Sequence, residues 1–311
     1  MGSRIQYNQS MSNFPHLSGV FAAALTPLTQ EFAPDLEAIP LLLAFLAKRG
    51  CHGALLLGTT GEGPSYSPEE RKAILEAAVL VRQVHPGFKL LAGTGTPSLD
   101  ETIKLTRAAF DLGIDAVVVL PPYYFKKVPD EGLFNWFSQV IQKGLPSDGQ
   151  ILAYHIPAVS GVPVSLDLLE QLECAYPDRF VGLKDSSGDP QHALDLGNRF
   201  GKRMIVLNGN DRLFSLALQS GAAGCITAMA NLFSPDLRRV WDAHQNGSPD
   251  ELTQQRLSAA RQVMDRFPPA PPLLKSLLAA QGHFPLWAVR PPLIPASAEN
   301  VEIAVEELSR I

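Results

Sequence analysis

Eight short apolar runs, which alternate with longer amphipathic stretches, limit most strongly how this chain can fold. From Gly19 onward each run but the last lies about 25 to 35 residues before the next, the length of one strand with its crossover helix. Runs this uniformly apolar are typical of parallel strands that are covered on both faces. The runs are VFAAAL, GALLLG, KLLAGTG, AVVVLPPYY, QILAYHIP, FVGLKDS, MIVLNGND and GCITAMAN.

Helix-start signals stand between these runs. Residues 67–70 form a capping box with proline at the first helical position, and residues 98–101 form a second box. Ser234 and Pro235 are expected to open a third helix, and residues 248–251 are expected to cap another. The alternation predicts an α/β fold, a closed (β/α)8 TIM barrel with additional C-terminal helices. An open, doubly wound sheet is the alternative.

The pattern divides the chain into three segments. Residues 1–18 are polar and lack an apolar signal region, and we expect a disordered or tag-like lead there. Residues 19–247 are predicted to form the (β/α)8 barrel. Residues 248–311 are predicted to be a C-terminal helical extension that packs on the barrel and is not a separate domain.

Composition excludes several classes of function. The net charge of −5 and the lack of a Lys/Arg cluster argue against a nucleic-acid partner, and no apolar stretch predicts a membrane span. There is no HExxH or His-x-His spacing, no GxGxxG and no GxSxG, so neither a metal nor a cofactor is expected. Three widely spaced cysteines indicate buried thiols in a reducing compartment, and hence a cytoplasmic protein: Cys51, Cys174 and Cys225.

The segment VGLKDSSGD places a lysine in a strand that is otherwise apolar. Because side chains alternate across a strand, Gly182 and Lys184 are expected to face the barrel interior, with the glycine leaving room beside the amine, while Val181 and Leu183 face the helices. The same rule turns Tyr154 inward and His155 outward. In a barrel the chemistry lies at the carboxyl ends of the strands, which makes Lys184 and Tyr154 the leading candidates.

A buried lysine is useful when its amine is neutral. Lowering its pKa from about 10.4 to about 7 takes roughly 4 to 5 kcal/mol, which burial can supply. A neutral amine attacks ketones, and the resulting Schiff base acts as an electron sink. Such chemistry makes or breaks a carbon–carbon bond without a metal.

Taken singly, the polar residues at the strand ends have simpler interpretations. A lysine there is more often solvated, a tyrosine usually packs, and GTTGEG can be only a tight turn. The residues at the strand ends are Thr59, Thr60, Glu62, Tyr123, Tyr124, Tyr154, Lys184, Asn210 and Asp211.

Together, however, these segments resemble the dihydrodipicolinate synthase and N-acetylneuraminate lyase family, whose members are Schiff-base-forming lyases built on a barrel. The resemblance extends from Gly19 to the C-terminus. It rests on GTTGE at 58–62, PPYY at 121–124, YHIP at 154–157, GLKDSSGD at 182–189 and GND at 209–211.

The resemblance implies a catalytic role for four residues. Lys184 matches the lysine that condenses with pyruvate or another 2-oxo acid. Tyr154 matches the tyrosine that moves protons during imine formation and at the aldehyde oxygen. Thr59 and Tyr124 match its relay partners, with Tyr124 lent across the interface of a tight dimer. The resemblance thus implies a homo-oligomer, either a dimer or a dimer of dimers (a homotetramer).

Other residues are implied to bind substrate. Thr60, with Gly58 and the backbone N–H groups of the same turn, matches the site for the substrate carboxylate. Ile226 matches a residue that lines the pyruvate end of the pocket, and Gly209 lies in a loop at its edge. Glu62 is expected to be structural and to tie down its own turn.

Departures from the family pattern narrow the substrate. Val159 stands where dihydrodipicolinate synthases usually carry an arginine for the second carboxylate. Arg212 and Ala228 stand where neuraminate lyases present a carboxylate and a hydroxyl. The motifs are nearest the 2-keto-3-deoxygluconate and 4-hydroxy-2-oxoglutarate aldolases.

We therefore expect an aldolase that interconverts a 2-oxo-4-hydroxy acid with pyruvate and an aldehyde. One alternative is a 4-hydroxy-tetrahydrodipicolinate (dihydrodipicolinate) synthase that condenses pyruvate with aspartate semialdehyde and uses Lys126, Lys127 or Arg212 as its second cation. The others are a hydratase or dehydratase outcome of the same imine, and a non-catalytic ligand-binding barrel.

Overall fold

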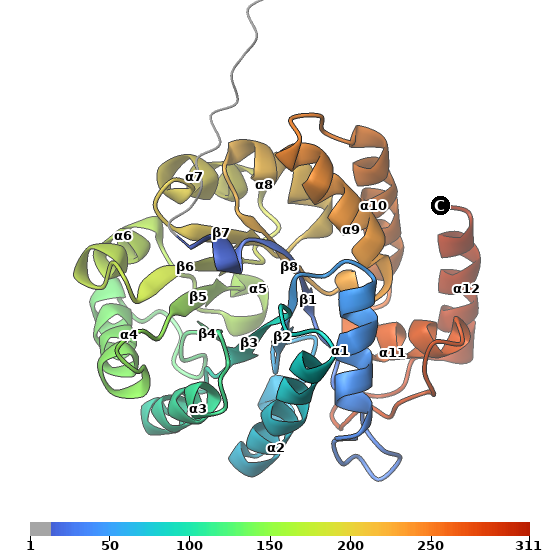
Figure 1. The fold of residues 1–311 in the computed structure, drawn as a ribbon, viewed down its shortest axis with the longest axis horizontal. Coiled ribbons are helices and arrows are strands. Elements are labelled where there is room, and N and C mark those ends of the chain that lie inside the picture. The colour runs from blue at the N-terminus through green and yellow to red at the C-terminus, as the bar shows by residue number, and fades with distance from the viewer. Residues whose placement is uncertain (1–13) are drawn as a thin grey trace, which may run out of the picture.

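The eight apolar runs form eight parallel strands that close into a barrel in the order β1 to β8 (Figure 1). The structure, a computed structural model, describes residues 14–311. The predicted TIM barrel is therefore confirmed, and the open sheet is wrong because β1 also pairs with β8. The strands are β1 Gly19–Ala23, β2 Gly53–Leu56, β3 Lys89–Gly93, β4 Ala116–Val119, β5 Ile151–His155, β6 Phe180–Asp185, β7 Ile205–Asn208 and β8 Gly224–Thr227.

Helices surround the barrel, and the last of them add a layer at one side (Figure 1). The α-helices are α1 Ala38–Lys48, α2 Pro68–Val79, α3 Leu99–Asp111, α4 Asp130–Gly144, α5 Pro157–Ser160, α6 Leu166–Ala175, α7 Pro190–Phe200, α8 Phe214–Ser220, α9 Ala230–Gln245, α10 Glu251–Met264, α11 Ala270–Ala280 and α12 Ala298–Ser309. Short 3-10 helices are η1 Pro15–Leu17, η2 Gly63–Ser65, η3 Leu80–Gln83 and η4 Asp211–Leu213.

The local signals for helix starts are confirmed in part. Ser67 and Glu70 form the complete capping box of α2, while Ser98 caps α3 without the reciprocal bond. The third prediction agrees with the structure: α9 runs from Ala230, but the backbone of Phe233 is not helical, so two helices join there and the second begins at Ser234 and Pro235. The fourth prediction is wrong in position, because α10 is capped by Asp250. The Asp250 carboxylate accepts from the N–H of Thr253, so it takes the place expected for Ser248.

Two separate apolar clusters make up the core. One fills the barrel and includes Phe21, Leu152, Leu207 and Ile226, and the other lies between the strands and the surrounding helices. This division follows from strand alternation, since every second side chain faces each layer. The barrel interior is therefore packed, and space for a ligand is expected only at its ends.

Strand β6 departs from the predicted alternation. Leu183 packs in the helix layer as expected, but Val181 joins the cluster inside the barrel. The reason is a register shift against β5, where Ile151 pairs with Phe180 and Leu152 with Gly182, which leaves Val181 as an extra residue.

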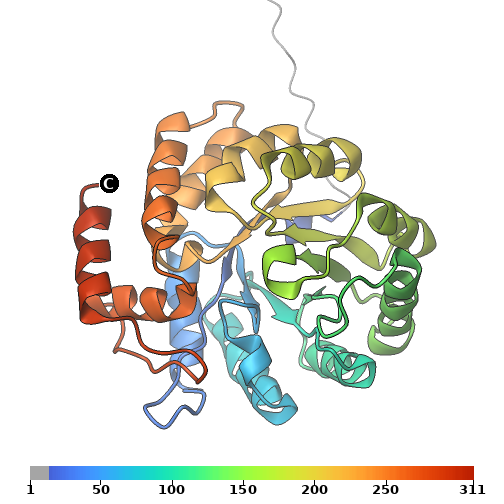
Figure 2. The same ribbon diagram turned by 180° about the vertical axis from the view of Figure 1, so that it is seen from behind.

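Both ends of the barrel segment make contacts beyond it. Leu17 of η1 is buried with Phe21 in the inner cluster, so residues before the boundary that we predicted at residue 19 pack on the barrel. Most of the predicted lead, residues 1–13, lies outside the described residues. At the other end, α10 packs against α8 and α9, and α11 and α12 continue this layer (Figure 2). None of the helices in residues 14–311 is long and apolar enough to cross a membrane.

Candidate active site at the carboxyl ends of the strands

Lys184 and Tyr154 lie side by side at the carboxyl ends of neighbouring strands. They are register partners in β6 and β5, and both are buried, with 3% and 5% of their surfaces exposed. The Lys184 Nζ atom lies 4.1 Å from the centroid of the Tyr154 ring, and Tyr154 belongs to the cluster inside the barrel. The structure therefore brings the two leading candidates together.

Thr59 completes a polar group around the Tyr154 hydroxyl. Its Oγ1 lies 3.3 Å from the Tyr154 hydroxyl, across the barrel mouth from β2. Burial raises the pKa of Tyr154, but the nearby Lys184 charge and hydrogen bonds with Thr59, Lys184 and Ser186 outweigh burial, so the pKa lies below its ordinary value. A phenol with a lowered pKa exchanges its proton more readily. Ser186 is a member of this group that the sequence analysis missed, although it lies only two residues after Lys184.

The turn that follows β2 presents Gly58, Thr59 and Thr60 to the same mouth. The N–H of Gly63 donates to the carbonyl of Gly58 and closes the turn, while the buried Thr60 lies at its apex. Within residues 14–311, the N–H groups of Thr60 and Gly61 donate to no protein acceptor. Unused amide donors in a tight turn suit a carboxylate oxygen.

Gly209 and Ile226 lie at neighbouring strands. A Cβ atom at Gly209 would lie 2.1 Å from the Ser186 Oγ, and the N–H of Gly209 donates to the Asp185 carbonyl at 2.6 Å. Only glycine lets the loop after β7 approach β6 this closely. Ile226 is fully buried in the cluster that also holds Tyr154.

Tyr124 stands apart from the other candidates. Its side chain is 75% exposed and packs edge-on against Phe125, in the loop after β4. No contact within residues 14–311 links it to Tyr154 or Thr59. A partner subunit would have to bring a Tyr124 side chain to this site.

The cations considered for a second carboxylate are partly occupied. The Lys126 ammonium donates to the backbone carbonyls of Tyr123 and Ser160, which joins the loop after β4 to α5. Arg212 pairs with Asp265, at the end of α10, at 3.5 Å. Asp211, next to it, is fully buried and pairs with Arg261 of α10 at 3.0 Å, so both side chains contact the C-terminal layer.

Glu62 makes wider contacts than we predicted. The Lys275 Nζ atom of α11 lies 2.5 Å from Glu62 Oε1, and the N–H of Arg290 donates to Oε2 at 3.1 Å. The structural role expected for Glu62 agrees with these contacts, which also join its turn to the C-terminal extension. Its partners come from residues more than 200 positions later in the chain, and no local pattern indicates them.

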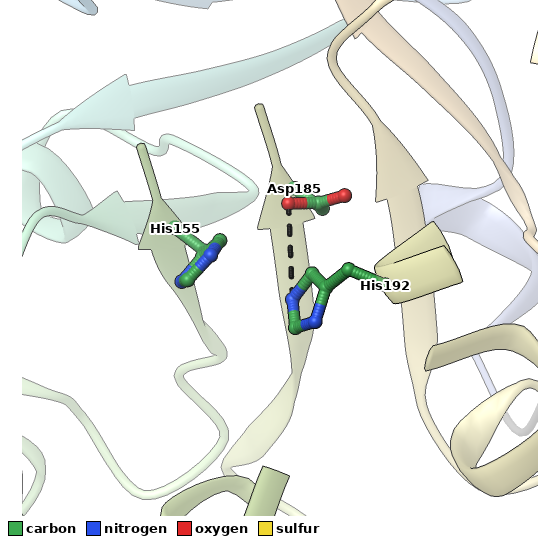
Figure 3. A group of neighbouring side chains, drawn as sticks. All are labelled: His155, Asp185 and His192. Atoms are coloured by element: carbon green, nitrogen blue, oxygen red, sulfur yellow. Dashed lines mark ion pairs between the residues drawn. The ribbon is translucent and has the colours of Figure 1, made fainter. Parts of the chain in front are cut away.

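Two histidines and an aspartate lie behind the site, on the outer side of β5 and β6 (Figure 3). His155 and His192 stack with ring centroids 4.7 Å apart, and His192 Nε2 lies 4.0 Å from the Asp185 carboxylate. The outward direction predicted for His155 agrees with this position. The sequence analysis did not place Asp185 and His192 beside His155, because His192 lies on α7 and is distant from His155 in the sequence.

The hydrogen bonding of this cluster does not suit a metal ion. The N–H of Val164 donates to His155 Nδ1 at 3.0 Å, and burial followed by the His192 charge lowers the pKa of His155 to about 4. The neutral ring therefore carries its proton on Nε2, which leaves no lone pair there for a metal. Only His192 and Asp185 could still act as ligands, fewer than the three or four in protein zinc sites.

Comparisons with known proteins agree with this arrangement. The model of the dihydrodipicolinate synthetase family matches residues 16–310. A protein of Chloroflexus aurantiacus, named an uncharacterized DapA-like lyase, is 42% identical over 285 residues, which are 91% of this chain and 93% of that protein.

Solved structures with the same fold include two from this group. The crystal structure of dihydrodipicolinate synthase from Agrobacterium tumefaciens has a TM-score of 0.85 and 30% identity, over 94% of this chain and 98% of that one. The crystal structure of YagE, a prophage protein of the dihydrodipicolinic acid synthase family from E. coli K12 in complex with pyruvate, has a TM-score of 0.88 and 25% identity, with the same coverage.

Proposed function

The chain belongs to the dihydrodipicolinate synthetase family of carbon–carbon lyases, and from this premise we propose that it is a class I aldolase that uses Lys184. It would interconvert a 2-oxo-4-hydroxy acid with pyruvate and an aldehyde, as for a 2-keto-3-deoxy sugar acid or 4-hydroxy-2-oxoglutarate. The observation that carries the proposal is the buried Lys184 amine beside the Tyr154 hydroxyl.

In the cleavage direction, the Lys184 amine attacks the keto carbon of the substrate, and loss of water gives an imine. Tyr154 takes the proton of the 4-hydroxyl as the bond between C3 and C4 breaks. The aldehyde leaves, and the electron pair of the broken bond moves into the enamine. Protonation of the enamine at C3 and hydrolysis of the imine release pyruvate and restore the amine.

The surrounding residues have positioning roles in this mechanism. Thr59 hydrogen-bonds to Tyr154 and supports proton transfer, and Tyr124 of a partner subunit would extend this relay. Gly58, Thr60 and the unused amides of their turn hold the pyruvate carboxylate, while Gly209 and Ile226 limit the pocket around the methyl end. The mechanism needs no metal or cofactor. Cys51 and Cys225 are buried, whereas Cys174 is exposed, so the expectation of a buried thiol is wrong there; all three are free, which fits a cytoplasmic enzyme.

The choice of the aldehyde rests on the residues at the mouth. Val159 is exposed on α5, where an arginine would be needed to bind a second carboxylate. Lys126 and Arg212 are held by backbone carbonyls and by Asp265 respectively. An uncharged, sugar-derived aldehyde therefore fits this mouth better than aspartate semialdehyde, and by the same reasoning a 2-keto-3-deoxy sugar acid fits better than 4-hydroxy-2-oxoglutarate, whose aldehyde product carries a carboxylate.

A 4-hydroxy-tetrahydrodipicolinate synthase is the second candidate. A relative from Streptomyces coelicolor with that name is 32% identical and matches 91% of this chain. This function requires a cation for the second carboxylate, either Lys127, which is exposed, or Lys126 or Arg212 after release from its present partners.

Trapping of the imine tests the proposal. Incubation with pyruvate and borohydride should add a covalent mass to Lys184, and the Lys184→Ala variant should stay unmodified. An unmodified wild-type chain would contradict the enzyme and favour a binding barrel. The kcat/KM values for a panel of aldehydes, with aspartate semialdehyde included, would then separate the two candidate functions.

A further inference from the structure

We propose that Glu62 and Lys275 are positioning residues for this reaction. In this view their buried ion pair holds the turn after β2 in the conformation that places Thr59 against Tyr154. The inference rests on the proposed function, because it assigns a role to the pair in the same proton relay. The three residues Glu62, Lys275 and Arg290 are called the Glu62 clamp below.

The turn after β2 has a backbone that needs outside support. Leu57 and Glu62 adopt left-handed conformations, with φ of 58° and 55°, although neither is glycine. Such conformations are strained for residues other than glycine and persist only where surrounding contacts hold them. Gly63 approaches the Leu57 carbonyl so closely that a Cβ atom there would lie 1.9 Å from it. The turn is therefore tight, and other contacts must hold it.

Thr26 Oγ1 donates to the Gly61 carbonyl of this turn at 2.7 Å, and the contacts to Glu62 come from the C-terminal extension. Glu62 Oε1 lies 2.5 Å from Lys275 Nζ, and Oε2 accepts from the N–H of Arg290 at 3.1 Å. Lys275 also donates to the Ala288 carbonyl at 2.7 Å. Because 0% of the Lys275 side chain and 1% of the Glu62 side chain are exposed, water cannot replace these bonds.

Arg290 braces the residues that follow the turn. Its guanidinium donates to both carboxylate oxygens of Glu70, at 2.7 and 2.8 Å, and to the Ser65 carbonyl at 2.9 Å. It also lies over the Tyr66 ring, 4.7 Å from its centroid. The Glu62 clamp thus contacts the chain on both sides of η2.

The position of this ion pair indicates that it fixes the geometry of the turn more than it increases the stability of the fold. Burying two charges carries a large desolvation cost, and a well-packed apolar pair of similar volume is often as stable. A carboxylate held by two directional donors, however, fixes its backbone more closely than apolar contacts do. This pair fixes the one turn that carries Thr59 and Thr60.

A direct connection leads from the clamp to the site. The N–H of Glu62 donates to the Thr59 carbonyl at 3.1 Å, and the Thr59 hydroxyl lies 3.3 Å from that of Tyr154. A shift of Glu62 therefore moves Thr59. Misplacement of a relay group by about 1 Å can slow a reaction about 100-fold.

The test measures how fast the Lys184 adduct forms with saturating pyruvate and borohydride, per folded molecule. We expect Glu62→Gln and Lys275→Met to slow this step by up to about 100-fold. Glu62→Asp keeps the charge but shortens the reach, and we expect an intermediate loss; this variant carries the test where the other two do not fold. The control is Asp115→Asn, which breaks an ion pair with Arg82 before β4, at the opposite end of the barrel. It should leave the rate unchanged.

A double-mutant cycle separates an effect on the position of Thr59 from a general loss of rigidity in the fold. If the clamp acts through Thr59, adding Glu62→Gln to Thr59→Val should cost little beyond Thr59→Val alone. Clamp variants that react as fast as the wild type, or losses that multiply in the cycle, overturn the inference and leave the proposed function intact. A wild-type chain that forms no adduct overturns both.

Discussion

Two lysines are buried among the residues that the structure describes, and their surroundings differ in kind. Lys275 has a carboxylate partner, Glu62, and donates a second bond to a backbone carbonyl. Lys184 has no carboxylate partner within residues 14–311, and its neighbours are the Tyr154 ring and hydroxyl. Because a buried charge without a counter-charge is costly, a site like that of Lys184 is retained when the amine itself reacts. The paired lysine is structural by the same reasoning.

Removal of the Tyr154 hydroxyl gives the first prediction. In Tyr154→Phe the ring still packs, but the proton carrier beside Lys184 is lost, and kcat should fall about 100- to 10,000-fold. The control is Tyr176→Phe, because among residues 14–311 the Tyr176 hydroxyl bonds to Gln142 alone, away from the site. A Tyr154→Phe enzyme that keeps its full kcat would mean that another group moves the proton.

His155 gives a prediction about stability and pH. Burial lowers its pKa to about 4, below its value of 6.5 in the unfolded chain. As the pH falls below 6.5, His155 is protonated in the unfolded chain but stays neutral in the folded chain. The free energy of unfolding therefore decreases until about pH 4. Between pH 7 and pH 5 this residue should lower the free energy of unfolding by about 2 kcal/mol.

Urea unfolding at the two pH values measures this effect. The matched variant is His155→Asn, whose Oδ1 can accept from the N–H of Val164 in place of Nδ1. In this variant the free energy of unfolding should differ less between pH 7 and pH 5 than it does in the wild type. An equal difference in both proteins would assign the pH dependence to other groups.

At the scale of elements, β6 contains one irregularity that leaves the direction of Lys184 unchanged. The extra residue Val181 turns inward, and the alternation then resumes so that Leu183 faces the helices and Lys184 faces the mouth. We expected Gly182 to leave room beside the amine. The structure gives another reason, since a Cβ atom there would lie 2.0 Å from the Ile205 carbonyl of β7.

Gly182→Ala is therefore predicted to force β6 and β7 apart. The contact is with backbone, which cannot rotate away, and we expect a loss of about 2 kcal/mol or more in the free energy of unfolding. Gly87→Ala is the control, because a Cβ atom there would contact nothing within 4 Å. Urea denaturation compares the two, and equal stability would show that the strands can adjust.

At the scale of the whole molecule, large apolar side chains are exposed in the segments that follow β4 and β5. Tyr124 and Phe125 are exposed apolar rings in the loop after β4, and α5 places the exposed Val159 after β5. Lys126 fastens this loop to α5 through two backbone carbonyls. A loop that is fixed in position and exposes two aromatic side chains is typical of a subunit interface, in line with the dimer that we expect.

Mixed oligomers test whether Tyr124 acts in the neighbouring subunit. Lys184→Ala and Tyr124→Phe subunits should each be weak alone. In a random mixture of dimers, half are mixed, and each of these has one complete site out of two, so about a quarter of the wild-type activity should return. If no activity returns although mixed dimers form, Tyr124 serves its own chain, and a Tyr124→Phe enzyme that is fully active alone would show that Tyr124 has no role.

The sequence by itself determined the barrel and the direction of its two central side chains. Parallel strands covered on both faces must be apolar throughout, and alternation then places Lys184 and Tyr154 on the inner side. These are local properties, readable from runs of a few residues. The family resemblance carried by the motifs is likewise confirmed over residues 16–310.

Only the tertiary structure decided which distant groups meet. The extra residue in β6 depends on how it pairs with β5, and the partners of Glu62 depend on where α11 packs. The stacking of His155 on His192, and the position of Ser186 beside Tyr154, likewise need the closed barrel. Such contacts join segments far apart in the chain, and their energies depend on three-dimensional proximity that no local pattern records.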